Sequence, residues 1–360
     1  MSRARDFADL AGSADAGGLT GRNLIINGAM EVAQRSTSET GLGGNASYPT
    51  LDRFRQNTSN TAGRFTMSQA AVTDLPGFAN CLKLQCTTAD TSIASNELGI
   101  IMQRIEGQDL QQLKKGTSSA ESVTVSFYVK GNAAATYTAE LNDGGNDRQI
   151  SKTFSVTTSW NRVSLTYPGD TSGTIDDDNT AGLELNIWIH AGSNFTSGTL
   201  STTWTSTTNA NRVSSSATSF FDSTSRTLEI TGLQMEVGEQ ATPFEHRSFG
   251  DELARCQRYY QRGFSNGALG VATSSTLATF GFRLVREMRN TPSVGFNSGV
   301  SALSCDMTHV TGSYSWSPTN YRFESNSGFS GFGSKSGSGA GDRGNPIEVK
   351  GDYLYADAEL

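Results

Sequence analysis

The sequence predicts an all-β protein: two packed antiparallel sheets, followed by a short connector helix and a smaller C-terminal β domain. Charged residues make up only 18% of the 360 residues, whereas glycine contributes 39, and Ser, Thr and β-branched residues are abundant. This composition is typical of many short strands and turns. Several segments also alternate apolar and polar side chains with a period of two. A long helical bundle or coiled coil needs far more Glu, Lys, Leu and Ala and is excluded as the main architecture.

The clearest strands are predicted at 121–131 and 183–192. Their core-facing residues are Val123, Val125, Phe127, Val129, Leu183, Leu185, Ile187 and Ile189. Asn27-Gly28 predicts a hairpin turn near the start, and Gly232 fits a bulge in a late strand. Residues 100–113 fit either a helical turn or a strand followed by a loop, and both options stay open at this point.

The chain divides into four predicted parts: an opening segment at 1–22, the sandwich at 23–247, the connector helix at 248–263 and the C-terminal β domain at 264–360. Phe7 and Leu10 share one face of a short helix in the opening segment, which is either a disordered leader or an attachment peptide that orders against a partner. The Gly- and Ser-rich stretch 325–344 predicts a mobile loop or an exposed tip.

The connector helix carries one apolar stripe. Phe249, Leu253, Cys256 and Tyr260 recur at helical spacing, and Ser248 with Asp251 resembles a capping box. Either the helix packs on its own domain, or the stripe meets copies of itself about a symmetry axis. We expect the second arrangement, with these four residues at the oligomer contact.

Composition and motifs exclude several functions. The net charge is −7 without a basic cluster, so we expect no nucleic-acid partner. No apolar stretch is long enough for membrane insertion. The four cysteines fit buried residues of a reduced protein rather than a disulfide framework or a metal site, and we expect no metal and no cofactor. The acidic loop 176–179 is more typical of a solvated turn than of a Ca²⁺ site.

The sequence also lacks the common catalytic motifs. No nucleophile elbow, phosphate-binding loop or zinc-protease motif occurs, and the three histidines lie far apart along the chain. Glu184, Glu229 and Glu236 on predicted strands leave glycosidic acid/base catalysis as the one enzymatic option. Because acidic residues on strand faces are usually solvated, we expect no catalytic residue and no enzyme.

The polar side of the strands offers a candidate binding face. If the apolar sides of 123–129 and 183–189 form the core, Tyr128, Trp188 and His190 lie on the opposite sheet face. Aromatic rings flanked by amides and carboxylates suit sugars, because rings stack on pyranose faces. The alternative is that a loop or a neighbouring subunit covers these rings. Trp160 is expected to anchor the core, and Trp204 lies in a Ser/Thr-rich stretch without a clear strand pattern.

An ordered set of segments carries a family resemblance. The segments are NLIINGAMEVAQRST, YPTLDRF, IEGQDLQQLKKG, VTVSFYVKG, TTSWNRVSLTY and TLEITGLQMEVGEQATPFEHRSFGDELARCQRYYQ. Together they span about residues 22–262 and resemble bacteriophage tail fibre and related virion fibre proteins, and EMRNTPSV and YLYADAEL are similar to the C-terminal β domains of such fibres. The resemblance implies a carbohydrate-binding-module-like jelly roll, virion docking through the N-terminus, a homotrimer and distal domains that face the host. The matching residues are structural, so no ligand residue is carried over.

The sequence therefore predicts a phage virion structural protein, assembled in the host cytoplasm. We expect a tail fibre component that attaches to other tail or virion proteins and contributes to recognition of host cell-surface glycans. At 360 residues the chain lacks the long shaft of many fibres. Two alternatives stay open: a structural adaptor or head fibre without a receptor, and a virion-associated glycan-degrading enzyme.

Overall fold

The chain forms two structural units in the computed structural model, Met1–Glu252 and Leu253–Leu360. The structure describes residues 21–263, 268–272, 277–296, 303–307, 313–325, 327–336, 346–349 and 354–360. Phe7 and Leu10 of the predicted attachment segment lie outside these residues. Within the described part of the chain, no helix is long and apolar enough to span a membrane.

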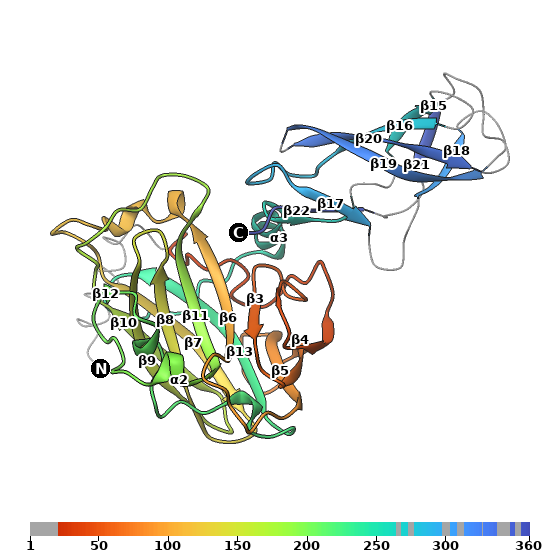
Figure 1. The fold of residues 1–360 in the computed structure, drawn as a ribbon. Helices are drawn as coiled ribbons and strands as arrows, with labels where there is room; N and C mark the ends of the chain where they lie inside the picture. The colour runs from red at the N-terminus through yellow and green to blue at the C-terminus, as the bar shows by residue number, and fades with distance from the viewer. Residues whose placement is uncertain are drawn as a thin grey trace. The chain divides into compact units, whose positions relative to one another are not determined.

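The N-terminal unit is a sandwich of two antiparallel sheets (Figure 1). The six-stranded sheet contains, in spatial order, β1 (Ser38–Leu42), β4 (Arg64–Ala71), β5 (Asn80–Thr88), β13 (Thr227–Val237), β7 (Val123–Gly131) and β10 (Asn161–Tyr167). The seven-stranded sheet contains β12 (Thr205–Ser206), β9 (Arg148–Val156), β8 (Ala135–Asp143), β11 (Ala181–Ala191), β6 (Leu98–Glu106), β3 (Arg55–Ser59) and β2 (Ala46–Ser47). From β6 onward the chain passes repeatedly between the sheets, which is the connectivity of a jelly roll. The predicted all-β fold is confirmed.

The core lies between the sheets, where the alternation placed it. All eight predicted core residues of β7 and β11 are buried in one apolar cluster together with Phe65, Phe154 and Phe220. Gly232 has a φ of +60°, and the pairing of β13 with β7 shifts register between Thr231 and Gln234, so the predicted bulge is confirmed. The stretch 100–113 takes the second option: β6 ends at Glu106, and two short 3-10 turns follow, η1 (Gly107–Asp109) and η2 (Gln111–Leu113).

The predicted hairpin at Asn27-Gly28 is wrong. Residues 23–34 contain no strand; they run as an irregular segment beside the end of β13, where the Leu24 amide donates to the Met235 carbonyl. The side chain of Asn27 replaces ladder bonds, since its Oδ1 accepts from the Val32 amide and its Nδ2 donates to the Val32 carbonyl. The Gly28 carbonyl accepts from the Leu233 amide (2.9 Å), so it pairs with β13 and not with a hairpin partner.

The helix α3 (Phe249–Gln257) begins as predicted but ends early. The Asp251 amide donates to Ser248 Oγ (3.2 Å), which confirms the predicted cap, and Ser248 Oγ donates to Asp251 Oδ2 (2.6 Å), so the return bond of this capping-box-like start comes from the Ser248 hydroxyl. The helix stops before Tyr260, which belongs instead to the short strand β14 (Tyr260–Gln261).

The predicted oligomer stripe is therefore not one helical face. Cys256 is fully buried in the monomer, and Tyr260 is 5% exposed and stacked on Tyr355. Leu253 is half-buried, and Phe249 is exposed. Because two of its four members are already enclosed, the stripe cannot meet other copies as a continuous surface.

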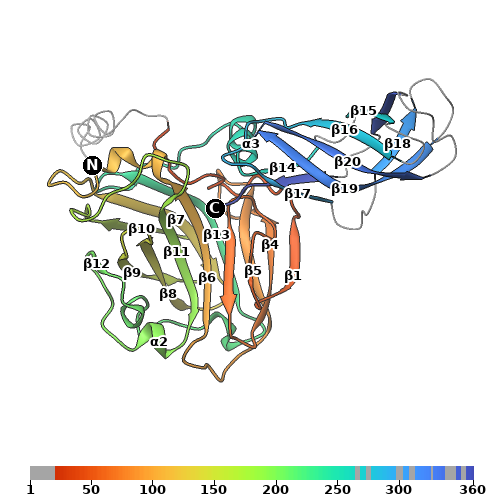
Figure 2. The same cartoon turned by 45° about the horizontal axis from the view of Figure 1, so that its top comes forward.

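The C-terminal unit contains a small sheet and a closed barrel (Figure 2). The sheet consists of β14, β22 (Leu354–Asp357) and β17 (Ser293–Phe296). The barrel consists of β15 (Leu269–Ala272), β16 (Leu277–Arg283), β20 (Gly328–Ser336), β19 (Ser313–Ser325), β18 (Leu303–Met307) and β21 (Pro346–Val349).

Strand β20 corrects the expectation of a mobile loop for the part of 325–344 that it occupies, and residues 326 and 337–344 lie outside the described residues. Its Gly-rich backbone pairs on one side with β16 and on the other with β19. Ladder hydrogen bonds use backbone groups alone, so glycine can take part wherever two partner strands are supplied.

Candidate functional site

The three predicted binding residues lie on two different sheets. Tyr128 is on β7 of the six-stranded sheet, whereas Trp188 and His190 are on β11 of the seven-stranded sheet. Each points to the outer side of its own sheet, since the alternate residues of both strands fill the core. The predicted common platform is therefore wrong: the sandwich core separates Tyr128 from the other two.

The Trp188 side chain is buried and does not form part of a binding surface. It is 1% exposed and lies in a second apolar cluster with Ile100, Met102 and Val213. Val213 belongs to the segment 192–219, which forms most of the connection from β11 to β13 and carries α2 (Ser193–Thr196) and β12 (Figure 2). This segment covers Trp188, which is the alternative that the sequence left open.

A buried carboxylate holds this cover in place. Glu140 on β8 is fully buried and accepts hydrogen bonds from Trp188 Nε1 (2.8 Å) and Asn186 Nδ2 (3.1 Å). Arg212 of the covering segment adds two more, from Nε to Oε1 (2.7 Å) and from an Nη to Oε2 (2.8 Å), and its guanidinium lies 5.0 Å from the centre of the Trp188 ring. Four donors on one carboxylate offset the cost of burying it.

Tyr128 is part of a surface cluster on the other sheet. Its ring lies 5.4 Å from the ring of Phe78, which in turn lies 5.2 Å from Phe244 and 5.3 Å from His246. Three of these rings are half-buried and that of His246 is exposed. We call these four residues the aromatic patch.

The bulge in β13 makes the aromatic patch possible. A Cβ atom on Gly232 would lie 2.7 Å from Phe78 Cζ and 3.1 Å from Tyr128 Cδ2, so only glycine lets both rings pack over the strand. The sequence predicted Tyr128 but missed Phe78, Phe244 and His246. The available signal was weak: two aromatic side chains at alternate positions of the turn-like segment 241–247, after the last strand.

A charged row lies beside the aromatic patch. Lys130, two residues after Tyr128 and therefore on the same side of β7, pairs with Glu229 (3.2 Å) and Asp74 (2.9 Å). Its hydrogen bond to Asp74 holds the pKa of that carboxyl below its usual value. Trp160 Nε1 also donates to Asp74 (2.8 Å), and the Lys130 ammonium lies 4.8 Å from the centre of the Trp160 ring. Trp160 is thus a half-buried surface residue, not the predicted core anchor.

The three candidate carboxylates do not form an acid/base pair. Glu184 is on the seven-stranded sheet and pairs with Arg104 (2.7 Å). Glu229 and Glu236 are both on β13, seven residues apart, which is roughly 20 Å along a strand. Glycosidases need separations of about 5–10 Å. The predicted acid/base option therefore has no geometric basis in these residues.

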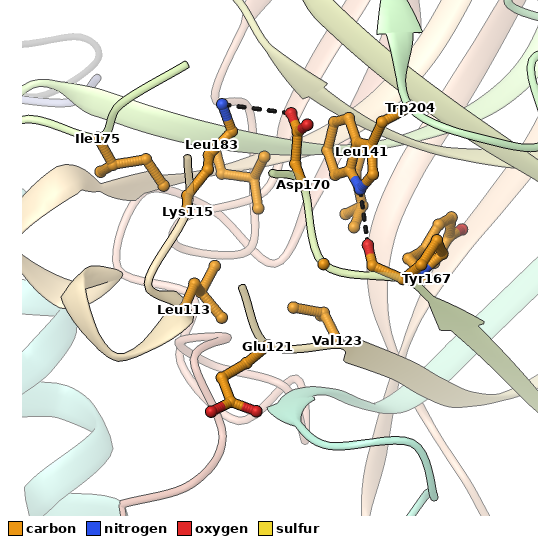
Figure 3. Close-up of a pocket in the computed structure, with 12 residues that line it drawn as sticks. Leu113, Lys115, Glu121, Val123, Leu141, Tyr167, Asp170, Ile175, Leu183 and Trp204 are labelled. Atoms are coloured by element: carbon orange, nitrogen blue, oxygen red, sulfur yellow. Dashed lines mark hydrogen bonds and ion pairs between the residues drawn. The ribbon is translucent and has the colours of Figure 1, made fainter. Parts of the chain in front are cut away.

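The cavity at one end of the sandwich is too small for a sugar. Lys115 and Asp170 face it, joined by an ion pair of 3.3 Å, and Trp204 lines it while donating to the Pro168 carbonyl (2.7 Å) (Figure 3). The cavity volume is about 20 Å³, which is room for about one water molecule. Lys115 also pairs with Asp143 (2.6 Å) and Asp170 with Arg148 (2.6 Å), so each of these two charged groups at the cavity has a second counter-charge.

Cysteines and acidic loops give no metal centre in the described residues. No group of three or more His, Cys, Asp or Glu side chains there is placed to hold an ion. Asp178 of the acidic loop instead accepts from the Thr180 amide (2.9 Å) and hydroxyl (2.7 Å), as in an ordinary turn. Cys81 and Cys86 are buried as expected, and burial raises the pKa of the Cys81 thiol to about 12.

Comparison with known proteins finds solved structures that are similar to this chain only at low sequence identity and low TM-score. No protein-family model and no curated protein matches the chain. A family 11 carbohydrate-binding module from Clostridium thermocellum, in complex with a β-1,3-1,4-mixed-linked tetrasaccharide, is 11% identical with a TM-score of 0.29, covering 57% of this chain and 99% of that chain. The module TmCBM61 in complex with β-1,4-galactotriose is 10% identical with a TM-score of 0.30, covering 61% and 100%.

One phage protein is among the similar structures. The enzymatically active domain of tailspike protein 4 from bacteriophage CBA120 is 12% identical with a TM-score of 0.31. The match covers 60% of this chain and 21% of that chain, so it spans about a fifth of the tailspike domain. At these identities and TM-scores, the likenesses assign this chain to no family.

Proposed function

We propose that the chain is a glycan-binding component of a phage virion fibre and that the aromatic patch is its contact surface. The observation that supports the proposal is the gathering of Phe78, Tyr128, Phe244 and His246, none of them fully buried, on the outer side of the six-stranded sheet. Apolar rings next to charged and amide groups suit the two kinds of surface on a sugar, its C–H faces and its hydroxyls.

The charged row supplies the polar half of this recognition. Lys130, Glu229 and Asp74 lie at the same end of the sheet as Tyr128, and Asp74 is more than half exposed. Carboxylate oxygens accept from sugar hydroxyls, and the ammonium donates to them. A site of this kind binds weakly on its own. We extend the proposal to a homotrimer attached to the particle through the N-terminal segment, because several weak sites gain avidity when linked.

The test is binding of the full chain to purified host-envelope polysaccharide, measured by surface plasmon resonance. Phe244→Ala removes the ring that contacts both Phe78 and His246, and we expect binding to fall about tenfold, or about 1.4 kcal/mol. Phe195→Ala is the matched control, because Phe195 is also half-buried but packs against Trp188 on the other sheet. The control should bind like the unmodified chain.

Two results would overturn the proposal in different ways. If Phe244→Ala binds as tightly as the unmodified chain, the aromatic patch is not the contact surface. If the unmodified chain binds no host polysaccharide, the protein is a structural adaptor and the patch packs against another virion protein. Light scattering on the same sample checks the trimer.

A further inference from the structure

A Ser-His-Glu arrangement lies beside the outer side of the seven-stranded sheet. Ser219 Oγ lies 2.8 Å from His190 Nδ1, and His190 Nε2 lies 2.8 Å from Glu97 Oε2. The sequence predicted a role for His190 but for neither of its partners, because Ser219 and Glu97 lie 29 and 93 positions from it along the chain and belong to no motif. We infer that this cluster is a hydrolytic site, with Ser219 as nucleophile, His190 as general base and Glu97 as the residue that positions the imidazole.

The hydrogen bonds fix the proton positions that such chemistry needs. An ionised carboxylate only accepts, so Glu97 places the imidazole proton on Nε2 and leaves Nδ1 as an acceptor for the Ser219 hydroxyl. Glu97 is itself held, because its Oε1 accepts from the Ala94 amide (2.7 Å). The His190 side chain is fully buried and that of Glu97 is 4% exposed, which fixes the orientation of the pair. This is the logic of a nucleophile, a base and an orienting acid.

Local backbone features aim His190 and Ser219 at each other. The pairing of β11 with β6 shifts register between Trp188 and His190, and such bulges redirect side chains. Gly99 lies opposite His190, where a Cβ atom would come within 3.1 Å of the His190 Cβ. Ser219 Oγ also accepts from the Phe221 amide (3.1 Å), which caps the 3-10 turn Phe220–Asp222 and fixes the position of the hydroxyl.

A small pocket opens at Ser219 and indicates the substrate class. Ser219 and His190 line it together with the apolar residues Ile93, Ala191 and Val213. Its cavity volume, on the same measure as for the cavity lined by Lys115 and Asp170, is about 30 Å³, which is room for about two water molecules and so for no more than a small acyl group. Ser219 is half-buried and His190 is buried, so a substrate reaches the oxygen from one side. The site therefore suits esters of small acyl groups, such as acetyl esters.

The reaction balances with water as the second reactant. Ser219 Oγ forms a bond to the acyl carbon as its proton passes to His190 Nδ1, and the ester C–O bond breaks as that proton moves to the leaving alcohol. Water then attacks the acyl-serine and gives a proton to His190 Nδ1. The carbon–Oγ bond breaks, Ser219 regains the proton, and a carboxylic acid leaves. The inference is independent of the aromatic patch.

The test is covalent labelling of the full chain with a small alkyl fluorophosphonate, in which fluoride leaves as Oγ bonds to phosphorus. Tandem mass spectrometry of the tryptic peptide at 213–226 locates the adduct, and we expect it on Ser219 alone. Ser216→Ala is the matched control: this serine is exposed, lies on the same peptide and should leave labelling unchanged. Ser219→Ala should abolish labelling and the hydrolysis of p-nitrophenyl acetate.

The two partner residues have separate readouts. His190→Gln should slow labelling by about a hundredfold or more, because the general base is gone. Glu97→Gln should slow labelling about tenfold without lowering the Tm, because it keeps the size of the side chain but loses the charge that stabilises the imidazolium formed in the reaction. A purely structural role for Glu97 would lower the Tm and the labelling rate together. Absence of an adduct on Ser219 in the unmodified chain, or equal labelling in His190→Gln, would overturn the inference.

Discussion

Arg212→Ala tests whether the segment 192–219 really closes the outer side of the seven-stranded sheet. The substitution removes two hydrogen bonds and the counter-charge from Glu140, which is fully buried. Removing one partner of a buried ion pair costs about 3–5 kcal/mol. Because Trp188 and Asn186 still donate to Glu140, we expect the lower end of that range. The lost contact of the guanidinium with the Trp188 ring adds about 0.5–1 kcal/mol, for a total of about 3–4 kcal/mol.

Thermal unfolding of the full chain, followed by tryptophan fluorescence, measures this cost. For a unit of this size about 1 kcal/mol shifts the Tm by about 2–4 °C, so Arg212→Ala should lower it by roughly 6–16 °C. The matched control is Arg104→Ala, which breaks a pair with Glu184 whose side chains are 27% and 18% exposed. Such a pair contributes about 0–1 kcal/mol, or at most about 4 °C. Equal shifts in the two variants would refute the buried network and the closed cover with it.

Two further predictions concern the sandwich. Gly28→Ala would place a Cβ atom 2.1 Å from the Leu233 carbonyl oxygen. Because the backbone must move to avoid this contact, we expect the Tm to fall by at least about 4 °C. Gly44→Ala is the control and should leave the Tm unchanged, because the space around Gly44 is open. Burial raises the pKa of Asp170, but hydrogen bonds from Arg148 and a backbone amide outweigh this and hold the pKa below its usual value. The ionised Asp170 carboxylate therefore stabilises the fold above about pH 4. In urea unfolding, the unmodified chain should have a larger free energy of unfolding than Asp170→Asn, and this difference should shrink as the pH falls below about 4. A difference that stays constant with pH would contradict the prediction.

The sequence predicts what depends on neighbours along the chain. Apolar and polar side chains alternate along β7 and β11 because one face of each strand packs in the apolar core. This alternation was therefore enough to predict the inward residues of both strands. The bulge could be predicted because a backbone position with a positive φ, such as that of Gly232, favours glycine whatever its distant neighbours are. The capping box at Ser248 is likewise settled within four residues.

The features that the sequence did not predict depend on packing between residues far apart in the chain. Trp188 and Tyr128 look alike in the sequence, since each is an aromatic residue on the polar side of a strand. Only Trp188 is buried, because a segment about 25 residues further along the chain covers it and binds Glu140 through Arg212. Phe78 and Phe244 meet across more than 160 residues. The strand in the Gly-rich stretch exists because two partner strands are available to it, which the composition of that stretch does not record.

The same separation gives the two proposed sites independent tests. The aromatic patch and the Ser219 pocket lie on the outer sides of opposite sheets, with the apolar core between them. Substitutions at well-separated positions act additively. Phe244→Ala should therefore leave fluorophosphonate labelling intact, and Ser219→Ala should leave polysaccharide binding intact. If both variants lost both properties, the common cause would be a damaged sandwich rather than either site, and the Tm of each variant would reveal it.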